Sequence, residues 1–266
     1  MSIHPSAIIN PAAELDSTVT IGPYAVIENG AKIGAETEIG PHALIGGHTI
    51  IGKNNKVGPF TSIGTPPQDI TYAGEDTKVR IGDNNIIREY CSIHRGTVSG
   101  HGETVIGNNN MIMDYCHIAH DCILKNHIVL VNNAQLAGHV EIGDRVTIGG
   151  MTAIHQFSRV GEYAFVGGMS GISMDVPPYL IVAGIRNDMS VRSINRIGLK
   201  RAGFSGDDIR KLGRAFTIIF KTEELLLQDA LEQAASEMPD SPLVQNLIQF
   251  FKDASRSVVR LSKDEE

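Results

Sequence analysis

The sequence predicts a parallel β-helix followed by a short helical domain, and three observations point to this fold class. Branched aliphatic residues recur every six positions, small residues recur at the fifth position of the same blocks, and the period stops after Pro177. A period of six fits neither an amphipathic helix nor a free alternating strand. It fits a short strand and a turn on each side of a triangular prism, with three blocks in each coil.

The aliphatic anchor defines the phase of the repeat. Every sixth residue from Ile3 to Ile63 is Ile, Leu or Val, and the phase resumes at Ile81 and again at Ile106, from which it runs to Ile172. The fifth positions hold mostly small residues, among them Ala7, Ala25, Thr37, Asn55, Thr61, Cys91, Cys116, Cys122 and Ala134. We expect both positions to point inward, with glycine at position two easing the corner. Coils of 18 residues should then stack at roughly 4.8 Å.

Two interruptions and the end of the repeat set the expected domain organisation. Residues 65–80 and 96–105 leave a coil and return to it, so they should protrude as external loops, which often carry function. We assign residues 1–189 to the β-helix and residues 190–266 to a C-terminal helical domain that caps its open end. In that domain we expect a helix after an N-cap at Ser205. We expect two further helices, one from Glu223 to Met238 and one from Leu243 to Leu261.

Composition limits the function classes. The net charge of −7 argues against nucleic acid as a partner. Neither a signal peptide nor a run of about 18 apolar residues is recognisable, so we expect a cytoplasmic protein without integral membrane association. The stretch from Arg192 to Arg214 is nevertheless basic. It indicates either a local anionic partner or ordinary solvated helix faces.

A stripe of polar side chains marks the candidate site, because residues 18 apart in a β-helix lie above one another. His120, Gly138 and Gln156 have this spacing. Their neighbours complete the stripe: His117, Asp121, His139 and His155. Two chemistries suit such a cluster. Neutral imidazoles can bind a metal ion, or one histidine can act as general base on a sugar hydroxyl while an adjacent carboxylate holds its ring.

The sequence resembles the bacterial UDP-N-acetylglucosamine O-acyltransferases that begin lipid A synthesis. The likeness covers nearly the whole chain, and the motifs that carry it are His117-Ile-Ala-His120-Asp121, Leu136-Ala-Gly138-His139, Gly149 to Phe157, Pro67-Gln68-Asp69, Ile93 to Thr97, Asp175 to Tyr179 and Gly198 to Arg201. The hexads alone indicate only the wider superfamily, whereas the histidine motifs together with the tail are specific.

The resemblance implies a left-handed coil and a homotrimer with active sites between neighbouring subunits. His120 would remove the proton from the 3-hydroxyl of UDP-N-acetylglucosamine, and Asp121 would support it. The backbone N–H of Gly138 would stabilise the oxyanion formed on the thioester. The donor would be a 3-hydroxyacyl chain on acyl carrier protein, and neither a cofactor nor a metal would be needed.

The same resemblance implies two further groups of residues. Positions that bind the sugar nucleotide and the acyl chain are Gln68, Asp69, His117, His139, His155, Gln156, Asn195 and Arg201. Gly168 and the neighbouring Met169 would set the acyl length. The chain departs from the family pattern at Thr71, where a lysine is usual, and at Ala202, where an arginine is usual.

Three other interpretations stay open at this stage. A sugar N-acyltransferase of the same fold would take an amine at the 3-position, and Thr71 leaves that acceptor possible. A γ-type carbonic anhydrase would place three zinc-binding histidines at the trimer interface, but it would need no helical tail facing a carrier protein. A purely structural β-helix would not need the polar stripe.

Overall fold

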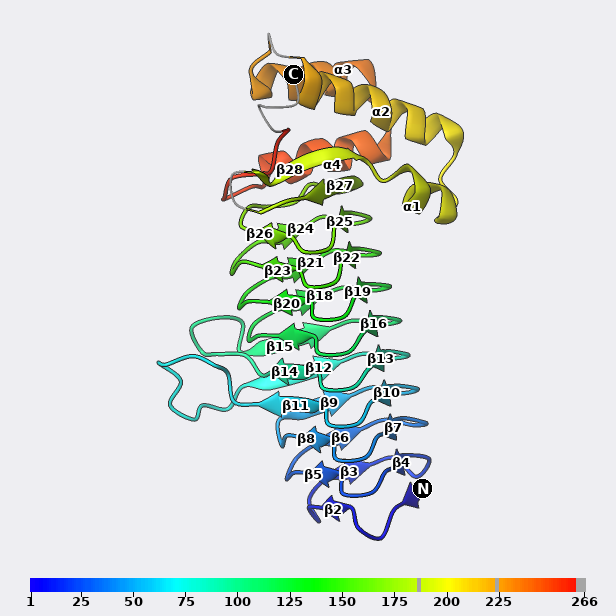
Figure 1. Ribbon diagram of the computed structural model, residues 1–266, viewed down its shortest axis with the longest axis vertical. Coiled ribbons are helices and arrows are strands. Elements are labelled where there is room, and N and C mark those ends of the chain that lie inside the picture. Colours follow the sequence, from blue (N-terminus) through cyan, green and yellow to red (C-terminus); the bar gives the residue numbers. More distant parts are fainter. Residues whose placement is uncertain (186–187, 223–224, 262–266) are drawn as a thin grey trace.

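The computed structural model describes residues 1–185, 188–222 and 225–261. It is a left-handed parallel β-helix with helices stacked on its C-terminal end, which confirms the predicted fold class (Figure 1). The N-terminus and the helical segment lie at opposite ends of the long axis. Across the residues described, no helix combines the length and the apolar character that crossing a membrane requires.

Three sheets of short strands, parallel except for β28, form the faces of the prism. The first face contains β1 (Ser2–Ile3), β4 (Thr20–Ile21), β7 (Glu38–Ile39), β10 (Lys56–Val57), β13 (Ile86–Ile87), β16 (Met111–Ile112), β19 (Val129–Leu130), β22 (Thr147–Ile148), β25 (Phe165–Val166), β27 (Leu180–Ala183) and β28 (Ser190–Ile194). The second contains β2 (Ile8–Ile9), β5 (Val26–Ile27), β8 (Leu44–Ile45), β11 (Ser62–Thr65), β14 (Ser92–His94), β17 (His117–Ile118), β20 (Gln135–Leu136), β23 (Ala153–Ile154) and β26 (Gly171–Ile172). The third contains β3 (Glu14–Leu15), β6 (Lys32–Ile33), β9 (Thr49–Ile51), β12 (Lys78–Ile81), β15 (Glu103–Ile106), β18 (Ile123–Leu124), β21 (Glu141–Ile142) and β24 (Arg159–Val160).

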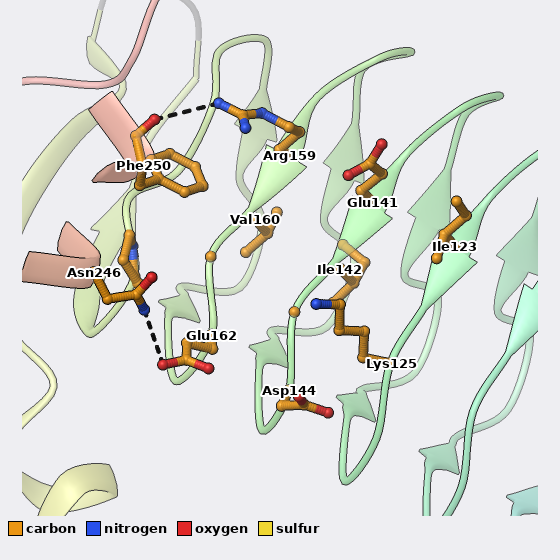
Figure 2. Close-up of a pocket in the computed structure, with 13 residues that line it drawn as sticks. Ile123, Lys125, Glu141, Ile142, Asp144, Arg159, Val160, Glu162, Asn246 and Phe250 are labelled. Carbon is orange, nitrogen blue, oxygen red and sulfur yellow. Dashed lines mark hydrogen bonds between the residues drawn. The ribbon is translucent and has the colours of Figure 1, made fainter. Parts of the chain in front are cut away.

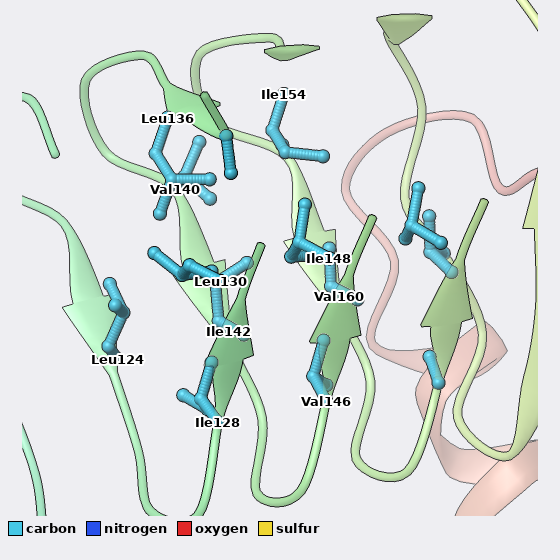
Figure 3. Close-up of a cluster of buried hydrophobic side chains, with 14 of the residues drawn as sticks. Leu124, Ile128, Leu130, Leu136, Val140, Ile142, Val146, Ile148, Ile154 and Val160 are labelled. Atoms are coloured by element: carbon cyan, nitrogen blue, oxygen red, sulfur yellow. The ribbon is translucent and has the colours of Figure 1, made fainter. Parts of the chain in front are cut away.

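The core is a column of stacked aliphatic side chains inside the prism (Figure 3). Leu124, Ile142 and Val160 succeed one another along the third face, and each is at most 2% exposed. Because every strand is only a few residues long, the anchor of one coil must pack on the anchors of the coils above and below. Burial of each such side chain contributes about 1.5–3 kcal/mol.

Polar residues inside the prism bond from coil to coil. Asn85 is fully buried, and its backbone N–H and side-chain amide both donate to Asn55 Oδ1, at 2.9 and 3.0 Å. The amide also donates to Gly107 O at 2.9 Å, while Asn85 Oδ1 accepts from the backbone N–H of Asn110 at 2.9 Å. A buried amide is therefore tolerated because both of its ends are bonded.

The corners contradict one sequence expectation, because glycine at position two does not supply the turn conformation. The left-handed residue is at position four and is usually not glycine, as with Tyr24 (φ 59°) and Phe60 (φ 57°). Glycine at position two is needed for space instead. A Cβ on Gly40 would lie 2.7 Å from Val57 O on the next coil, closer than real contacts allow.

Two corners of the prism are used below. The turns between the second and third faces carry His120, His139 and His155, and we call them the histidine corner. The turns between the first and second faces form the aromatic corner, in which the stacked rings are Tyr24, His42, Phe60, Tyr90 and Tyr115. Adjacent ring centroids lie 4.8–5.2 Å apart, so side chains repeat with the coil spacing.

Two excursions leave the prism on the same side (Figure 1). Residues 66–77, between β11 and β12, form the first excursion, and residues 95–102, between β14 and β15, form the second. Both are shorter than the segments expected from the sequence. Residues 78–80 pair with residues 103–105, and this pairing extends the ladder of the third face into the predicted loops.

The C-terminal helices are α1 (Arg196–Arg201), α2 (Gly206–Lys221), α3 (Leu227–Glu237) and α4 (Pro242–Lys252). The expected cap is present, because the Ser205 side chain and Asp208 form a capping box at the start of α2. Part of the helix expected from Glu223, residues 223–224, lies outside the described residues, as do residues 262–266 of the expected domain. β28 pairs antiparallel with β27 on the first face, so the boundary after residue 189 stays a prediction.

The expectation of a helix from Leu243 to Leu261 is wrong in its second half. Helix α4 ends at Lys252, and the chain then runs back along the last coil. Val259 is fully buried, and its N–H donates to Asp175 O at 2.9 Å. Packing on the prism thus outweighs helical propensity in this segment.

We predict that Asn85→Ala destabilises the protein by about 2–5 kcal/mol, because it leaves the Asn110 N–H and the Gly107 carbonyl buried without partners. Denaturant-induced unfolding followed by circular dichroism measures the change. Asn84→Gly is the control, since this neighbouring amide is exposed and its φ of 59° suits glycine. Equal effects of the two substitutions would contradict the bonding role of Asn85.

Candidate active site

The centre of the candidate site is a hydrogen-bonded histidine–aspartate pair at the histidine corner. His120 Nδ1 lies 2.9 Å from Asp121 Oδ2, and the Asp121 side chain is fully buried. Both residues follow β17 in a turn whose φ at Asp121 is 59°. An ionised carboxylate at Nδ1 holds the proton on that nitrogen and leaves a lone pair on Nε2. The Nε2 atom has no partner among the described residues, so it is available to a substrate.

Gly138 lies directly above the His120 ring on the next coil. A Cβ on Gly138 would lie 2.6 Å from His120 Cε1, so any side chain here would displace the imidazole. The Gly138 N–H also finds no acceptor in the described part of the chain. An unpaired N–H beside a candidate base is the arrangement that stabilises an oxyanion.

His139 completes the group from the same coil as Gly138. Its ring meets the His120 ring edge-on at 5.1 Å and stacks on Phe157 at 4.3 Å. Burial is the main cause that lowers the pKa of His139, against the opposing charge of Asp121. The ring is therefore held in its neutral form at neutral pH, and Phe157 fixes its plane.

Two further histidines lie beside this group: His117 on β17, the strand that precedes His120, and His94 on β14 of the coil below. His117 Nδ1 lies 2.8 Å from Ser92 Oγ, and His94 Nδ1 donates to Pro66 O at 2.6 Å. Burial first, and then His94 and His120, lower the pKa of His117 to about 4. These rings are neutral hydrogen-bonding groups rather than charges.

His94 also anchors the first excursion over the site. Its bond to Pro66 O holds the start of this segment, and Arg95 binds the Tyr72 hydroxyl through Nε at 3.0 Å. Asp69 lies near enough to His120 and His139 to interact electrostatically with both. Thr71 donates its N–H and its hydroxyl to Asp69 Oδ1, each at 2.8 Å, and these bonds lower the pKa of Asp69.

Within a single chain, the remaining residues predicted for the site do not gather around His120. His155 and Gln156 follow on the next coil of the histidine corner and are exposed, as is Gln68 on the first excursion. Gly168 and Met169 lie at the aromatic corner, on the other edge of the second face. Asn195 lies beside the turn between the third and first faces, since its amide donates to Tyr163 O at 2.9 Å.

Asn195 and Arg201 bracket helix α1. Asn195 Oδ1 accepts from the Gly198 N–H at 3.0 Å, so the side chain is the N-cap of this helix. Arg201 is the exposed last residue of α1. One chain does not bring either residue to the His120 group.

Sequence reasoning missed four residues that contact this centre: Ser92, His94, Thr97 and Thr104. The 18-residue rule failed here because the number of residues per coil is not constant. Ser92 pairs with His117 across 25 positions instead of 18, because the second excursion adds to the coil. Counting this coil as 25 residues instead of 18 aligns Ser92 with His117 and could have found it.

The site offers three possible metal ligands but little capacity to bind a metal. His120, Asp121 and His139 have ligand atoms within 4.8 Å of one another, and no other such group occurs in the described residues. The Asp121 oxygens already accept bonds from Thr97, His101 and His120. A metal ion at Asp121 would therefore have to compete with these donors.

A separate hollow of about 210 Å³ lies on the third face beside α4 (Figure 2). Two hydrogen bonds cross it: Arg159 donates to Phe250 O at 3.4 Å, and Asn246 donates to Glu162 Oε1 at 2.9 Å. These bonds fasten α4 to the prism. The hollow is thus a seam between the helix and the β-helix, away from the histidine corner.

Comparison with known proteins gives consistent matches. Residues 175–259 match the family model described as Udp N-acetylglucosamine O-acyltransferase, Domain 2, and residues 12–47, 30–65 and 103–138 match the bacterial transferase hexapeptide. An acyl-[acyl-carrier-protein]--UDP-N-acetylglucosamine O-acyltransferase from Paracidovorax citrulli is 51% identical, over 97% of this chain and 99% of its own. The relative of the same name from Halorhodospira halophila is 46% identical over the same shares. The crystal structure of UDP-N-acetylglucosamine O-acyltransferase from Moraxella catarrhalis is 43% identical, covers 98% of this chain and 100% of its own, and superposes with a TM-score of 0.93.

We predict that the protein loses stability as the pH falls from about 6.5 to about 4, and that His117 is one cause. In this window the unfolded chain binds a proton at His117 and the folded protein does not, so the free energy of unfolding decreases with decreasing pH. His117→Gln should make the loss smaller when urea unfolding is compared at pH 7 and pH 5. His127→Gln, at an exposed turn, is the control. An unchanged loss in the His117 variant would show that this ring is protonated in the folded protein.

Proposed function

We propose the following function for this chain, which belongs to the UDP-N-acetylglucosamine O-acyltransferase family. It transfers a 3-hydroxyacyl chain from acyl carrier protein to the 3-hydroxyl of UDP-N-acetylglucosamine, which is the first step of lipid A biosynthesis. One observation carries the proposal. The buried pair of His120 and Asp121 leaves Nε2 free beside the unpaired N–H of Gly138. A base and an oxyanion donor next to each other are what acyl transfer to a hydroxyl requires.

The reaction follows from this arrangement. His120 Nε2 takes the proton of the 3-hydroxyl as the oxygen attacks the thioester carbonyl carbon, and Asp121 stabilises the imidazolium that forms. The Gly138 N–H donates to the oxyanion of the tetrahedral intermediate. When the intermediate collapses, the C–S bond breaks and His120 returns the proton to the departing thiolate. The carrier protein leaves as a free thiol, and the sugar keeps the acyl ester.

A homotrimer would complete the site. The His120 group and the pair of Gly168 and Met169 lie at opposite edges of the second face, so one chain cannot bring them to one substrate. A ring of three copies packed through this face would place the aromatic corner of one subunit against the histidine corner of the next. The outer side of the second face suits such packing, because Ala153 and Gly171 are small and Ile8 is an exposed aliphatic side chain.

The carrier protein would dock beside the hollow between α1 and α2. Four cations line this hollow of about 550 Å³, namely Arg196, Lys200, Arg210 and Arg214. Arg210 and Arg214 also pair with Asp207 and Glu237, so Arg196 and Lys200 are the better candidates for a phosphate or an acidic helix. The proposal includes a cytoplasmic location, where acyl carrier protein is available as the donor.

Thr71 bears on which atom of the sugar accepts the acyl chain. Thr71 bonds to Asp69 and carries no charge to contact the sugar nucleotide, so a 3-amino sugar belongs in the same assay. The test is purified protein with UDP-N-acetylglucosamine or its 3-amino analogue and a panel of 3-hydroxyacyl carrier proteins. Faster transfer to the amine would replace the O-acyl assignment by the N-acyl one.

We predict that His120→Ala lowers kcat by about two to four orders of magnitude with little change in assembly, because the variant lacks the general base. Steady-state kinetics and analytical ultracentrifugation measure the two properties. His127→Ala at an exposed turn is the control and should match the wild type. The base would be assigned wrongly if the His120 variant kept more than about a tenth of the rate.

We further predict a preference for acyl chains of about twelve to fourteen carbons over ten, because Gly168 adds no side chain to the groove and each buried methylene contributes about 0.8 kcal/mol. Gly168→Met should reverse this order, as its Cβ would already lie 3.2 Å from Gly150 O and the rest of the side chain must extend outward. His127→Ala, at an exposed turn between the third and first faces, is the control and should leave the order unchanged. A wild type that prefers ten carbons would assign the ruler to Met169 or to another side chain.

A further inference from the structure

The second excursion folds over Asp121 and supplies most of the carboxylate's hydrogen bonds. Thr97 donates its hydroxyl to Oδ2 at 2.6 Å and its N–H to both oxygens at 3.1 Å. The His101 N–H donates to Oδ1 at 2.9 Å. Among the described residues, only the bond from His120 comes from outside the excursion. Thr97 itself is 3% exposed, so this is a closed contact rather than a surface one.

We propose that the second excursion is a clamp on Asp121 and that Thr97 is a positioning residue, whose hydroxyl draws negative charge away from the oxygen facing His120 and so keeps His120 unprotonated. The inference rests on the proposed function, because it concerns the state of the proposed base. A carboxylate that shares its charge with three loop donors still orients the His120 ring. It stabilises the imidazolium less than a carboxylate bonded to His120 alone would.

The excursion is built to fit closely around this carboxylate. A Cβ on Gly100 would lie 2.3 Å from Asp121 Cγ, so a side chain at this position would push the loop off the site. The N–H groups of Gly100 and Gly102 both donate to Thr97 O, at 3.1 and 3.0 Å, which closes the loop upon itself. The backbone is held as well, since the Asp121 N–H donates to Thr104 Oγ1 at 2.9 Å.

The hydrogen bonds decide the ionisation of Asp121. Burial raises the pKa of this carboxyl, but bonds from Thr97 and His120 outweigh burial and bring its pKa below the usual range. Asp121 is therefore an anion wherever the enzyme works. Its charge must be distributed among its donors, and the hydroxyl of Thr97 has the shortest of these bonds.

Other titratable groups also face His120, and they affect its protonation independently of Thr97. They are Asp69 from the first excursion, His117 from the preceding strand β17, His94 from the coil below and His139 from the coil above, with His101 of the second excursion next to His139. Among these groups only Asp69 is an anion, and it is outside hydrogen-bonding contact with His120. A change confined to the Thr97 hydroxyl leaves all of them in place.

The test is the pH dependence of kcat/KM for UDP-N-acetylglucosamine in full-length Thr97→Val. Removing the hydroxyl concentrates charge on Oδ2 and favours protonated His120, so the acid limb should move to higher pH by about half a unit or more. Above that limb His120 is neutral again, and the rate should return to within about tenfold of the wild type. Thr97→Ser keeps the donor and should restore the wild-type limb.

Ser99→Ala is the matched control, because Ser99 contacts the Thr97 hydroxyl at 3.1 Å but does not touch Asp121. It should leave the limb in place. An unmoved limb in Thr97→Val, or an equal loss of rate at every pH, would overturn the charge-sharing role and leave Thr97 as a structural residue. Retained activity in His120→Ala would instead refute the proposed base itself. Thermal unfolding of both Thr97 variants separates misfolding from either outcome, and Thr97→Ser keeps the comparison valid if the valine variant does not fold.

Discussion

The structure depends on one constraint, the hydrogen bonding of each coil to the next at the spacing of a parallel sheet. Backbone bonds such as Ala119 N–H to Leu136 O repeat along the whole prism, at 3.1 Å in this case. With roughly 4.8 Å between coils, the interior accepts one aliphatic anchor and one small partner per strand. The same closeness excludes a Cβ at Gly40, where the next backbone is already in contact.

The same constraint organises the chemistry. Corner residues repeat with the coil, so histidines placed 18 or 19 positions apart meet ring to ring, and His139 lies 5.1 Å from His120. Two protonated imidazoles at this distance would repel each other. Burial avoids this by keeping His117 and His139 neutral, while the buried carboxylate of Asp121 acts on His120. The site thus has one pair that can move a proton, surrounded by neutral donors and acceptors.

The two excursions add what a regular coil cannot provide. A six-residue block has no chain to spare for covering a carboxylate, and the second excursion supplies Thr97 and His101 for that purpose. The first excursion, held by His94 and Arg95, brings Asp69 over the same group. The two segments that depart from the repeat are therefore also the segments that contact the site. This coincidence supports the view that the prism is the scaffold and the loops adapt it to one reaction.

The sequence by itself determined the fold class, the inward positions and the histidine stripe. These follow from local periodicity, since one residue in six must be aliphatic and 18 positions must return to the same corner. The tertiary structure decided what periodicity cannot encode. Thr97 reaches Asp121 across 24 positions through an irregular loop, the 25-residue coil hides Ser92 and His94 from the 18-residue rule, and residues after Lys252 leave the helical path to pack on the last coil. Such contacts depend on which surfaces happen to lie within reach once the coils are stacked, and no short segment of sequence contains that information.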